Sequence, residues 1–115
     1  MNTAPNSITR LFLALWPSLA VQRQLHATQL RWAWPPLAKP TPPENLHLTL
    51  LFIGLVPTAR VTDIARGLVV PCSDFTFELD AAEVWPNGCA VMAVRRPPLD
   101  LLELHVALTA AMHGL

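Results

Sequence analysis

The sequence predicts an α+β fold, in which helices pack outside a mostly antiparallel sheet. Apolar segments of strand length alternate with segments whose apolar residues recur at helical spacing. Asn87-Gly88, between two such strand-like segments, is typical of a hairpin turn. The predicted order is β-α-β-α-β-β-α. We expect a loose tail at residues 1–9 and a single domain over residues 10–115.

The first segments read as a strand, a helix and a stiff loop. Arg10–Trp16 is a continuous apolar run, as expected for a central strand buried on both faces. Ser18 is a suitable N-cap for a helix that runs to about Trp32. Trp34–Pro43 contains five prolines and predicts an extended loop. Trp32 and Trp34 can stack on a base or pack beside the prolines, and we prefer packing.

The central segment, Glu44–Pro57, has the composition of a strand. Side chains alternate between the two faces of a strand, so His47 and Thr49 share one face. The other face is apolar and is expected to be buried; it carries Leu46, Leu48, Leu50 and Phe52. An imidazole and a hydroxyl side by side on a rigid element suit an oxygen-rich substrate such as a phosphate.

The second half of the chain predicts two helices and a hairpin. Gly114 is a natural C-terminal cap for the last helix, which is apolar on most sides and should be sandwiched between other elements. The predicted helices are Thr58–Val69 and Leu99–His113, and the predicted strands are Phe75–Trp85 and Cys89–Arg96.

Composition narrows the functional classes. The chain is 52% hydrophobic and only 14% charged, where about 25% charged is usual. This excess indicates either a deep core or apolar surface that another piece should cover. The formal net charge is zero, so bulk charge does not indicate nucleic-acid binding, although a local basic groove stays open.

The expected location is the cytoplasm. Cys72 and Cys89 have neither metal-ligand nor redox spacing, which favours two reduced thiols. No apolar run reaches the roughly 18 residues of a membrane span. Arg10 followed by Leu11–Val21 loosely imitates a signal peptide, but Trp16 and Pro17 interrupt the run, and the strand interpretation is better.

These segments together resemble the 2H phosphoesterase superfamily. The nearest family is the bacterial RNA 2′,3′-cyclic phosphodiesterases, also called 2′-5′ RNA ligase-like proteins. The resemblance covers roughly Arg10 to Leu115. It is carried by Arg-Leu-Phe-Leu-Ala-Leu at 10–15, Pro43-Glu44-Asn45-Leu46-His47-Leu48-Thr49-Leu50 with Gly54, Phe75–Glu78, Trp85-Pro86 and the Leu-rich helix before Gly114.

The resemblance implies a bilobal fold with two His-x-Thr/Ser motifs facing each other across a groove. One histidine protonates the leaving oxygen of a cyclic phosphodiester, the other activates water, and the hydroxyls hold phosphate oxygens. It implies neither metal nor cofactor, and RNA ends or small cyclic phosphodiesters as substrates. By the resemblance, His47 is the proton donor and Thr49 is a phosphate-oxygen ligand.

The resemblance is incomplete. The second motif should follow the helix that ends at Gly114, where this sequence stops, so we expect a C-terminally incomplete fold that is weak or inactive alone. His26-Ala27-Thr28 matches the motif literally, but residues i and i+2 do not face each other on a helix. His105 lacks the hydroxyl partner, and His113 suits a helix end.

Several alternatives stay open. His47 can be an ordinary packed or solvated histidine, and Thr49 can bond to a neighbouring strand. At most one of Arg95 and Arg96 can face the groove, and a surface pair is the simpler interpretation. The chain can also be a non-catalytic half-domain that binds RNA ends or self-associates through uncovered apolar surface. A small α+β protein with an accidental His-Leu-Thr is the third hypothesis.

Overall fold

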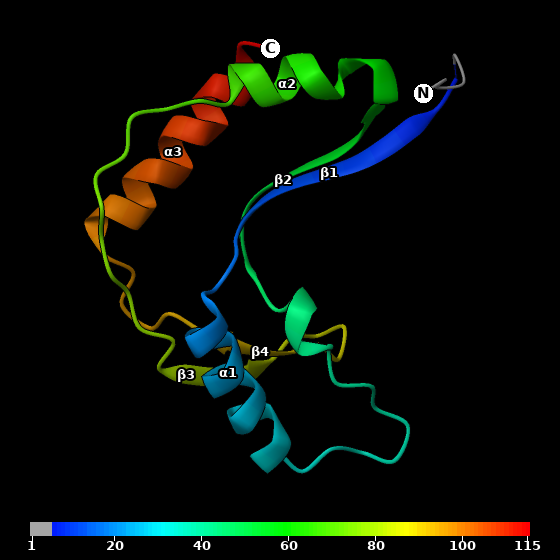
Figure 1. The fold of residues 1–115 in the computed structure, drawn as a ribbon, viewed down its shortest axis with the longest axis vertical. Coiled ribbons are helices and arrows are strands. Elements are labelled where there is room, and N and C mark those ends of the chain that lie inside the picture. Colours follow the sequence, from blue (N-terminus) through cyan, green and yellow to red (C-terminus); the bar gives the residue numbers. More distant parts are fainter. Residues whose placement is uncertain (1–5) are drawn as a thin grey trace. The chain divides into compact units, whose positions relative to one another are not determined.

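A computed structural model describes residues 6–115 of the protein (Figure 1). The chain divides into two compact units. One is Ile8–Val56, and the other is Pro57–Leu115 together with the N-terminal residues up to Ser7. Part of the loose tail expected at residues 1–9 lies outside the described residues, and Ile8 and Thr9 already belong to the first strand.

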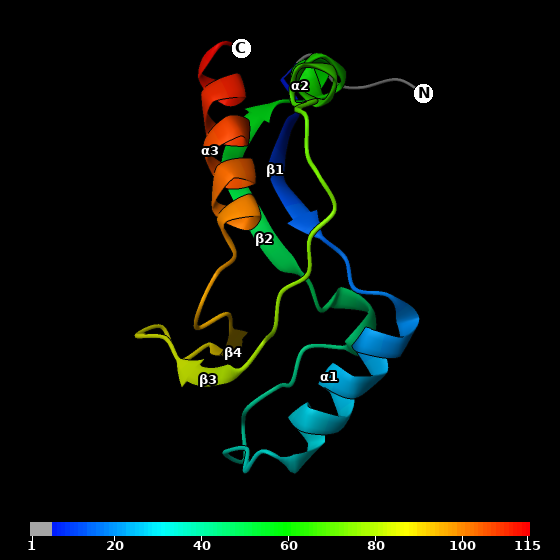
Figure 2. The same cartoon turned by 90° about the vertical axis from the view of Figure 1, so that its left-hand side faces the viewer.

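The unit Ile8–Val56 is built on a two-stranded sheet. Strand β1 (Ile8–Leu15) pairs with β2 (Leu48–Pro57), and the two strands run in opposite directions (Figure 2). The expectation that the first strand is buried on both faces is wrong. Phe12 is 42% exposed and lies with Ile8 and Arg10 on one face of the strand, which is open to solvent.

Helix α1 (Leu19–Arg31) begins where the sequence predicts. The Ser18 hydroxyl accepts a hydrogen bond from the Val21 amide at 3.3 Å, which satisfies one of the unpaired donors of the first turn. The helix ends at Arg31, and the Trp32 amide still donates to the Gln29 carbonyl. The proline-rich loop follows and leads to the short 3-10 helix η1 (Pro43–Asn45), which contacts α1.

The strand expected from Glu44 begins later, at Leu48. Proline has a fixed φ near −65° that suits the first turn of a helix, and Pro43 begins η1 in this way. Leu46 returns to extended backbone and η1 ends. The expected buried face is also only partly covered: Leu46, Leu48 and Leu50 are half-buried, whereas Phe52 is 77% exposed.

In the other unit, two helices surround a small core. The 3-10 turn η2 (Thr58–Arg60) leads into α2 (Val61–Gly67), which packs against α3 (Leu99–His113). This splits the predicted Thr58–Val69 helix, whereas both ends of Leu99–His113 are confirmed, as is Gly114 as the cap. The buried apolar residues are Ile64, Leu68 and Leu108.

The predicted hairpin is confirmed, with shorter strands. Strands β3 (Ala81–Val84) and β4 (Ala90–Ala93) are antiparallel, with Ala81 opposite Ala93. Gly88 has φ +86°, which glycine adopts without strain, and its amide donates to the Trp85 carbonyl at 2.8 Å. Residues 75–80 keep the predicted alternation of half-buried and exposed side chains but form no ladder.

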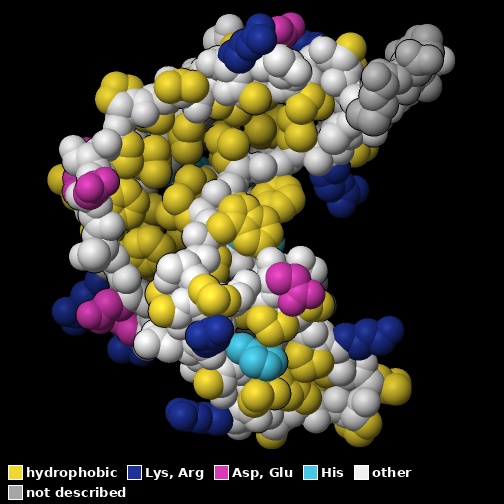
Figure 3. All heavy atoms as spheres, viewed as in Figure 1, with side chains coloured by type: hydrophobic (Ala, Val, Ile, Leu, Met, Phe, Trp, Pro, Cys, Tyr) yellow, Lys and Arg dark blue, Asp and Glu magenta, His cyan; other side chains and the backbone are white. Residues whose placement is uncertain are grey.

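Helix α3 is not sandwiched as its composition predicts. One side of it packs toward α2, and Leu108 on that side is buried. A second stripe is open to solvent, with Leu99, Leu102 and Val106 exposed by 68%, 49% and 66%. Figure 3 shows many hydrophobic side chains at the surface. In the described part of the chain, no helix combines the length and apolarity needed to cross a membrane.

Candidate functional site

His47 lies between η1 and β2, with its side chain exposed. Its Nδ1 is 2.7 Å from the Asn45 carbonyl oxygen. A carbonyl oxygen can only accept, so Nδ1 must carry the proton. Nε2 is therefore the ring nitrogen left for chemistry, and it makes no hydrogen bond to any described residue.

Two aromatic side chains from β1 and its continuation contact the imidazole. The ring centroids of Phe12 and Trp16 lie 5.1 and 5.0 Å from that of His47, at interplanar angles of 30° and 40°. Both aromatic rings are also partly open to solvent, and Trp16 is 57% exposed. The His47 ring is therefore restricted by two neighbours while its surroundings stay accessible.

Thr49 follows His47 by two residues and is half-buried on β2. Its hydroxyl makes no hydrogen bond to any other described residue. The alternative role of a cross-strand hydrogen bond therefore has no support in the described part of the chain. The hydroxyl is left available to a ligand.

Charge is divided unequally between the two units. Ile8–Val56 contains four basic residues and one acidic residue, Glu44, and so has a net charge of +3. The other unit contains four basic and seven acidic residues and has a net charge of −3. The zero total hides this division. The unit that holds His47 and Thr49 has the charge that attracts a phosphate-bearing ligand.

The other histidines have structural surroundings. His26 lies on α1 with Nδ1 3.2 Å from Gln29 Oε1, and the Thr28 hydroxyl donates to the Gln24 carbonyl at 3.1 Å. His26-Ala27-Thr28 is helical, as expected, and the side chains of His26 and Thr28 both contact other residues of α1. His105 lies within α3, and His113 is its last residue.

The tryptophans packed beside the prolines behave as the packing interpretation predicts. The ring centroids of Trp32 and Trp34 are 5.6 Å apart, and both residues are half-buried. Trp34 Nε1 donates to the Gln29 carbonyl at 2.9 Å, which attaches the start of the loop to α1.

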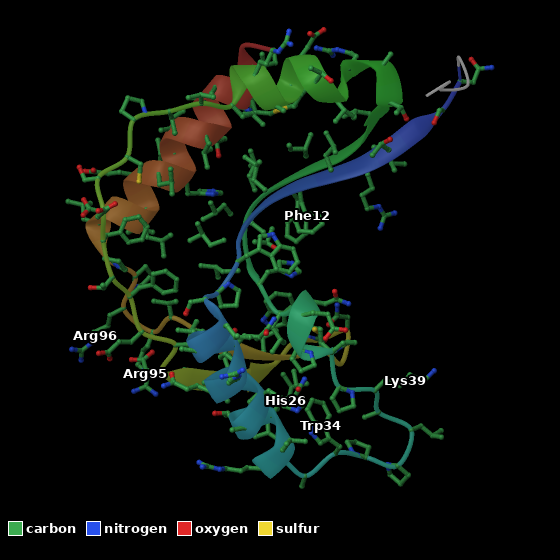
Figure 4. All side chains as sticks on the ribbon, in the orientation of Figure 1. Phe12, His26, Trp34, Lys39, Arg95 and Arg96 are labelled. Atoms are coloured by element: carbon green, nitrogen blue, oxygen red, sulfur yellow. The ribbon has the colours of Figure 1, made fainter. Side chains whose placement is uncertain are left out.

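Arg95 and Arg96 lie in the other unit, and both are exposed (Figure 4). The Arg95 amide donates to Asp80 Oδ1 at 2.9 Å, and its guanidinium Nη2 lies 3.3 Å from the Asp80 carbonyl. Both arginines line an open cavity of about 610 Å³ together with Asp80 and Glu78. The carboxylates offset the positive charge there, so the surface-pair interpretation fits best. No group of three potential metal ligands occurs within residues 6–115.

The sequence did not indicate three groups around His47: the Asn45 carbonyl and the Phe12 and Trp16 rings. Phe12 and Trp16 have a weak signal, since residues four apart on a strand share a face. Nothing in the sequence says that this face meets His47. The carbonyl has no sequence signal, because its direction depends on the 3-10 turn.

Comparison with known proteins identifies the family of the chain. Residues 17–90 match the family of LigT-like phosphoesterases. The chain is 30% identical over 99 residues to RNA 2′,3′-cyclic phosphodiesterase of Escherichia coli strain K12, covering 83% of this chain and 55% of that protein. It therefore spans about half the length of this curated relative.

Solved structures agree. Crystal structures of E. coli LigT complexed with NADP⁺ and with 3′-AMP are each 25% identical to the chain, with TM-scores of 0.81 and 0.82. Each comparison covers 94% of this chain and 65% of that one. The α+β fold with antiparallel strands is confirmed by this match.

Proposed function

We propose, from the premise that this chain belongs to the LigT-like phosphoesterase family, that it acts in the hydrolysis of RNA 2′,3′-cyclic phosphodiester ends. The name of the E. coli relative supports this substrate class. The proposed reaction opens the cyclic phosphodiester. Water adds its oxygen to phosphorus, the bond from phosphorus to O3′ breaks, and a 2′-phosphate remains.

His47 is the proposed proton donor. For this step the ring is the imidazolium, with Nδ1–H bound to the Asn45 carbonyl. Nε2–H gives its proton to O3′ as that oxygen leaves, and a second group takes the proton from the attacking water. The main support is the bond from Nδ1–H to the Asn45 carbonyl, because it fixes the ring and leaves Nε2 for substrate. The hydroxyl of Thr49 is the proposed ligand of a non-bridging phosphate oxygen.

Two features of the surroundings suit an RNA end. The exposed rings of Phe12 and Trp16 beside His47 offer apolar faces on which a terminal base can stack. The net charge of +3 on the unit Ile8–Val56 attracts the phosphate. The aromatic rings and the positive charge therefore both favour binding of an RNA end near His47, and both can be tested by substitution.

The decisive experiment uses a short RNA ending in a 2′,3′-cyclic phosphate and measures formation of the 2′-phosphate by ³¹P NMR. The mechanism needs two acid–base groups, and His47 is the one histidine that we assign to such a role. We therefore expect slow hydrolysis by the 115-residue chain, stimulated about tenfold or more by added imidazole, which supplies the second group. Activity should persist in EDTA.

The matched control is His47→Asn, which should abolish both the basal and the imidazole-stimulated rate while leaving the circular dichroism spectrum unchanged. His113→Asn, an exposed histidine at the end of α3, should retain both rates. Equal rates for His47→Asn and the unsubstituted chain would refute the assignment. Loss of activity in EDTA would refute a metal-independent reaction.

A second candidate function is binding without turnover, by a half-domain that recognises RNA ends or pairs with a copy of itself. The exposed apolar stripe of α3 favours self-pairing. Fluorescence anisotropy with cyclic-phosphate and 3′-hydroxyl RNAs separates the candidates: tight, end-dependent binding without product formation supports this one. The exposed free thiols of Cys72 and Cys89 suit a reducing compartment, and a cytoplasmic location is part of the proposal.

A further inference from the structure

Gln29, in the last turn of α1, is the one buried polar residue in the described chain, at 8% exposure. Both polar atoms of its side-chain amide have a partner. Nε2 donates to the Thr41 carbonyl at 3.0 Å, and Oε1 lies 3.2 Å from Nδ1 of His26. Its own carbonyl accepts from Trp34 Nε1. Figure 4 shows His26 and Trp34 close to the C-terminal half of α1.

These bonds attach the proline-rich loop to the helix. Little else holds the loop, because most of its side chains are exposed and Leu37 is 94% exposed. Apolar burial therefore contributes little to its position. The loop is attached near its start through Trp34 and near its end through Thr41, and Gln29 is the partner at both points.

The attachment at Thr41 reaches the candidate site through a short and stiff segment. Pro42 and Pro43 follow Thr41, and each has a fixed φ. The Asn45 amide donates to the Pro42 carbonyl at 2.9 Å, which closes the 3-10 turn. The Asn45 carbonyl then accepts from His47 Nδ1 at 2.7 Å. We therefore expect a displacement of Thr41 to move the carbonyl that orients the imidazole, although η1 also contacts α1 directly.

We propose that Gln29 is a positioning residue for His47. Its amide holds the end of the proline-rich loop, the loop fixes the 3-10 turn, and the turn directs the carbonyl that keeps the proton on Nδ1. The effect on catalysis rests on the proposed function, whereas the effect on the imidazole does not. Gln29 needs no contact with substrate, and it precedes His47 by 18 residues in the sequence.

The test distinguishes the two contacts of the Gln29 side-chain amide, one with Thr41 and one with His26. Gln29→Glu keeps an oxygen for His26 but replaces the donor to Thr41 with a carboxylate oxygen, which repels the carbonyl. His26→Phe removes the other contact and leaves the loop bond in place. Gln24→Glu, at an exposed position on the same helix, makes the same change of charge and is the matched control.

The first readout is the tautomer of the neutral His47 ring, from imidazole ¹⁵N shifts. The unsubstituted chain, His26→Phe and Gln24→Glu should show the Nδ1–H form. Gln29→Glu should show a mixture with the Nε2–H form. An unchanged tautomer in folded Gln29→Glu overturns the proposal. If that variant does not fold, Gln29→Met replaces it, because methionine keeps the length of the side chain and removes the donor to the Thr41 carbonyl; an unchanged tautomer in folded Gln29→Met is equally decisive.

The second readout is hydrolysis of the cyclic-phosphate RNA with added imidazole. Gln29→Glu should lower kcat about tenfold and change KM less than twofold, because the ring is misdirected while the binding surface is kept. A loss of rate with an unchanged tautomer refutes the positioning role but leaves the proposed function standing. A changed tautomer in a chain without any hydrolysis supports the positioning role and refutes the proposed function.

Discussion

At the residue scale, the candidate site is a histidine whose two ring nitrogens have different surroundings. Nδ1 is bound to the Asn45 carbonyl, and Nε2 faces no described partner. This asymmetry is what a directed proton transfer needs, because a ring free to rotate presents either nitrogen. Contacts with Phe12 and Trp16 oppose the same rotation from the sides of the ring.

Thr49→Val is the most direct test of the phosphate-ligand role. The substitution keeps the shape of a β-branched side chain and removes only the hydroxyl. We expect a loss of about a hundredfold in the imidazole-stimulated rate, comparable to removing one hydrogen-bond donor to a developing negative charge. Thr49→Ser should retain most of the rate. Kinetics with the cyclic-phosphate RNA provide the measurement.

The control is Thr109→Val, since the Thr109 hydroxyl only donates to the His105 carbonyl within α3. Its rate should equal that of the unsubstituted chain. Should Thr49→Val keep full activity, Thr49 is not a phosphate ligand. Its half-buried position on β2 is then purely structural.

The sequence predicted that His47 and Thr49 share a side of extended chain, because alternation along a strand is a local property. The groups that orient His47 were not predictable in the same way. The Asn45 carbonyl depends on where η1 ends, and the aromatic contacts depend on how β1 meets the segment before β2. These are relations between distant residues, and one sequence does not specify them.

At the element scale, Gly54 offers a clean stability test. It lies within β2 with φ +97°, a conformation that side chains with a Cβ adopt only with strain. No atom lies within 4 Å of a Cβ placed there, so crowding is not involved. Gly54→Ala should therefore destabilise the protein by about 1–2 kcal/mol through backbone strain alone, as measured by urea denaturation.

Gly114→Ala is the matched control for that substitution. Gly114 has φ −83°, an ordinary value for any residue, and the nearest atom to an added Cβ is 3.6 Å away. We expect a change within about 0.5 kcal/mol. Similar losses at both positions would show that the positive φ of Gly54 carries no cost.

Element boundaries were predictable where local signals coincide. Helix α3 begins directly after Pro98 and ends before Gly114, and proline and glycine at such positions are strong signals for the start and the end of a helix. The start of β2 was missed because Pro43 is compatible with an extended chain and with a 3-10 turn, and only tertiary contacts choose between them.

At the scale of the whole molecule, burial is the property that sequence predicted least well. The first strand and the last helix were expected to be covered on all sides, yet Phe12 on β1 and Leu102 on α3 are well exposed. An apolar composition shows that a side chain favours burial. It does not show whether a neighbour is present to bury it.

The exposed stripe of α3 predicts concentration-dependent association. Leu102→Lys should shift the chain toward monomer in sedimentation velocity, because it places a charge in the centre of the stripe. Asp100→Lys, at an exposed position that is neither three nor four residues from any member of the stripe, should leave association unchanged. A chain that is monomeric at all concentrations without substitution would contradict self-pairing.

The division of charge predicts how RNA binding responds to salt. With four basic residues in the unit Ile8–Val56, log affinity should fall with log salt with a slope no steeper than about −3 for single-stranded RNA. Lys39→Glu, in this unit, should weaken binding more than Arg60→Glu in the other unit. Anisotropy titrations at several salt concentrations measure both effects, and equal losses would show that the division has no role.

The junction of Ser7 with Thr58 has a consequence for how such chains can be rearranged. The Thr58 amide donates to the Ser7 carbonyl at 2.9 Å, and the two hydroxyls are also 2.9 Å apart. The 50 residues between Ser7 and Thr58 thus begin and end at the same point. A segment whose two ends meet has the topology of an inserted domain, which recombination could replace with another segment without moving the backbone on either side.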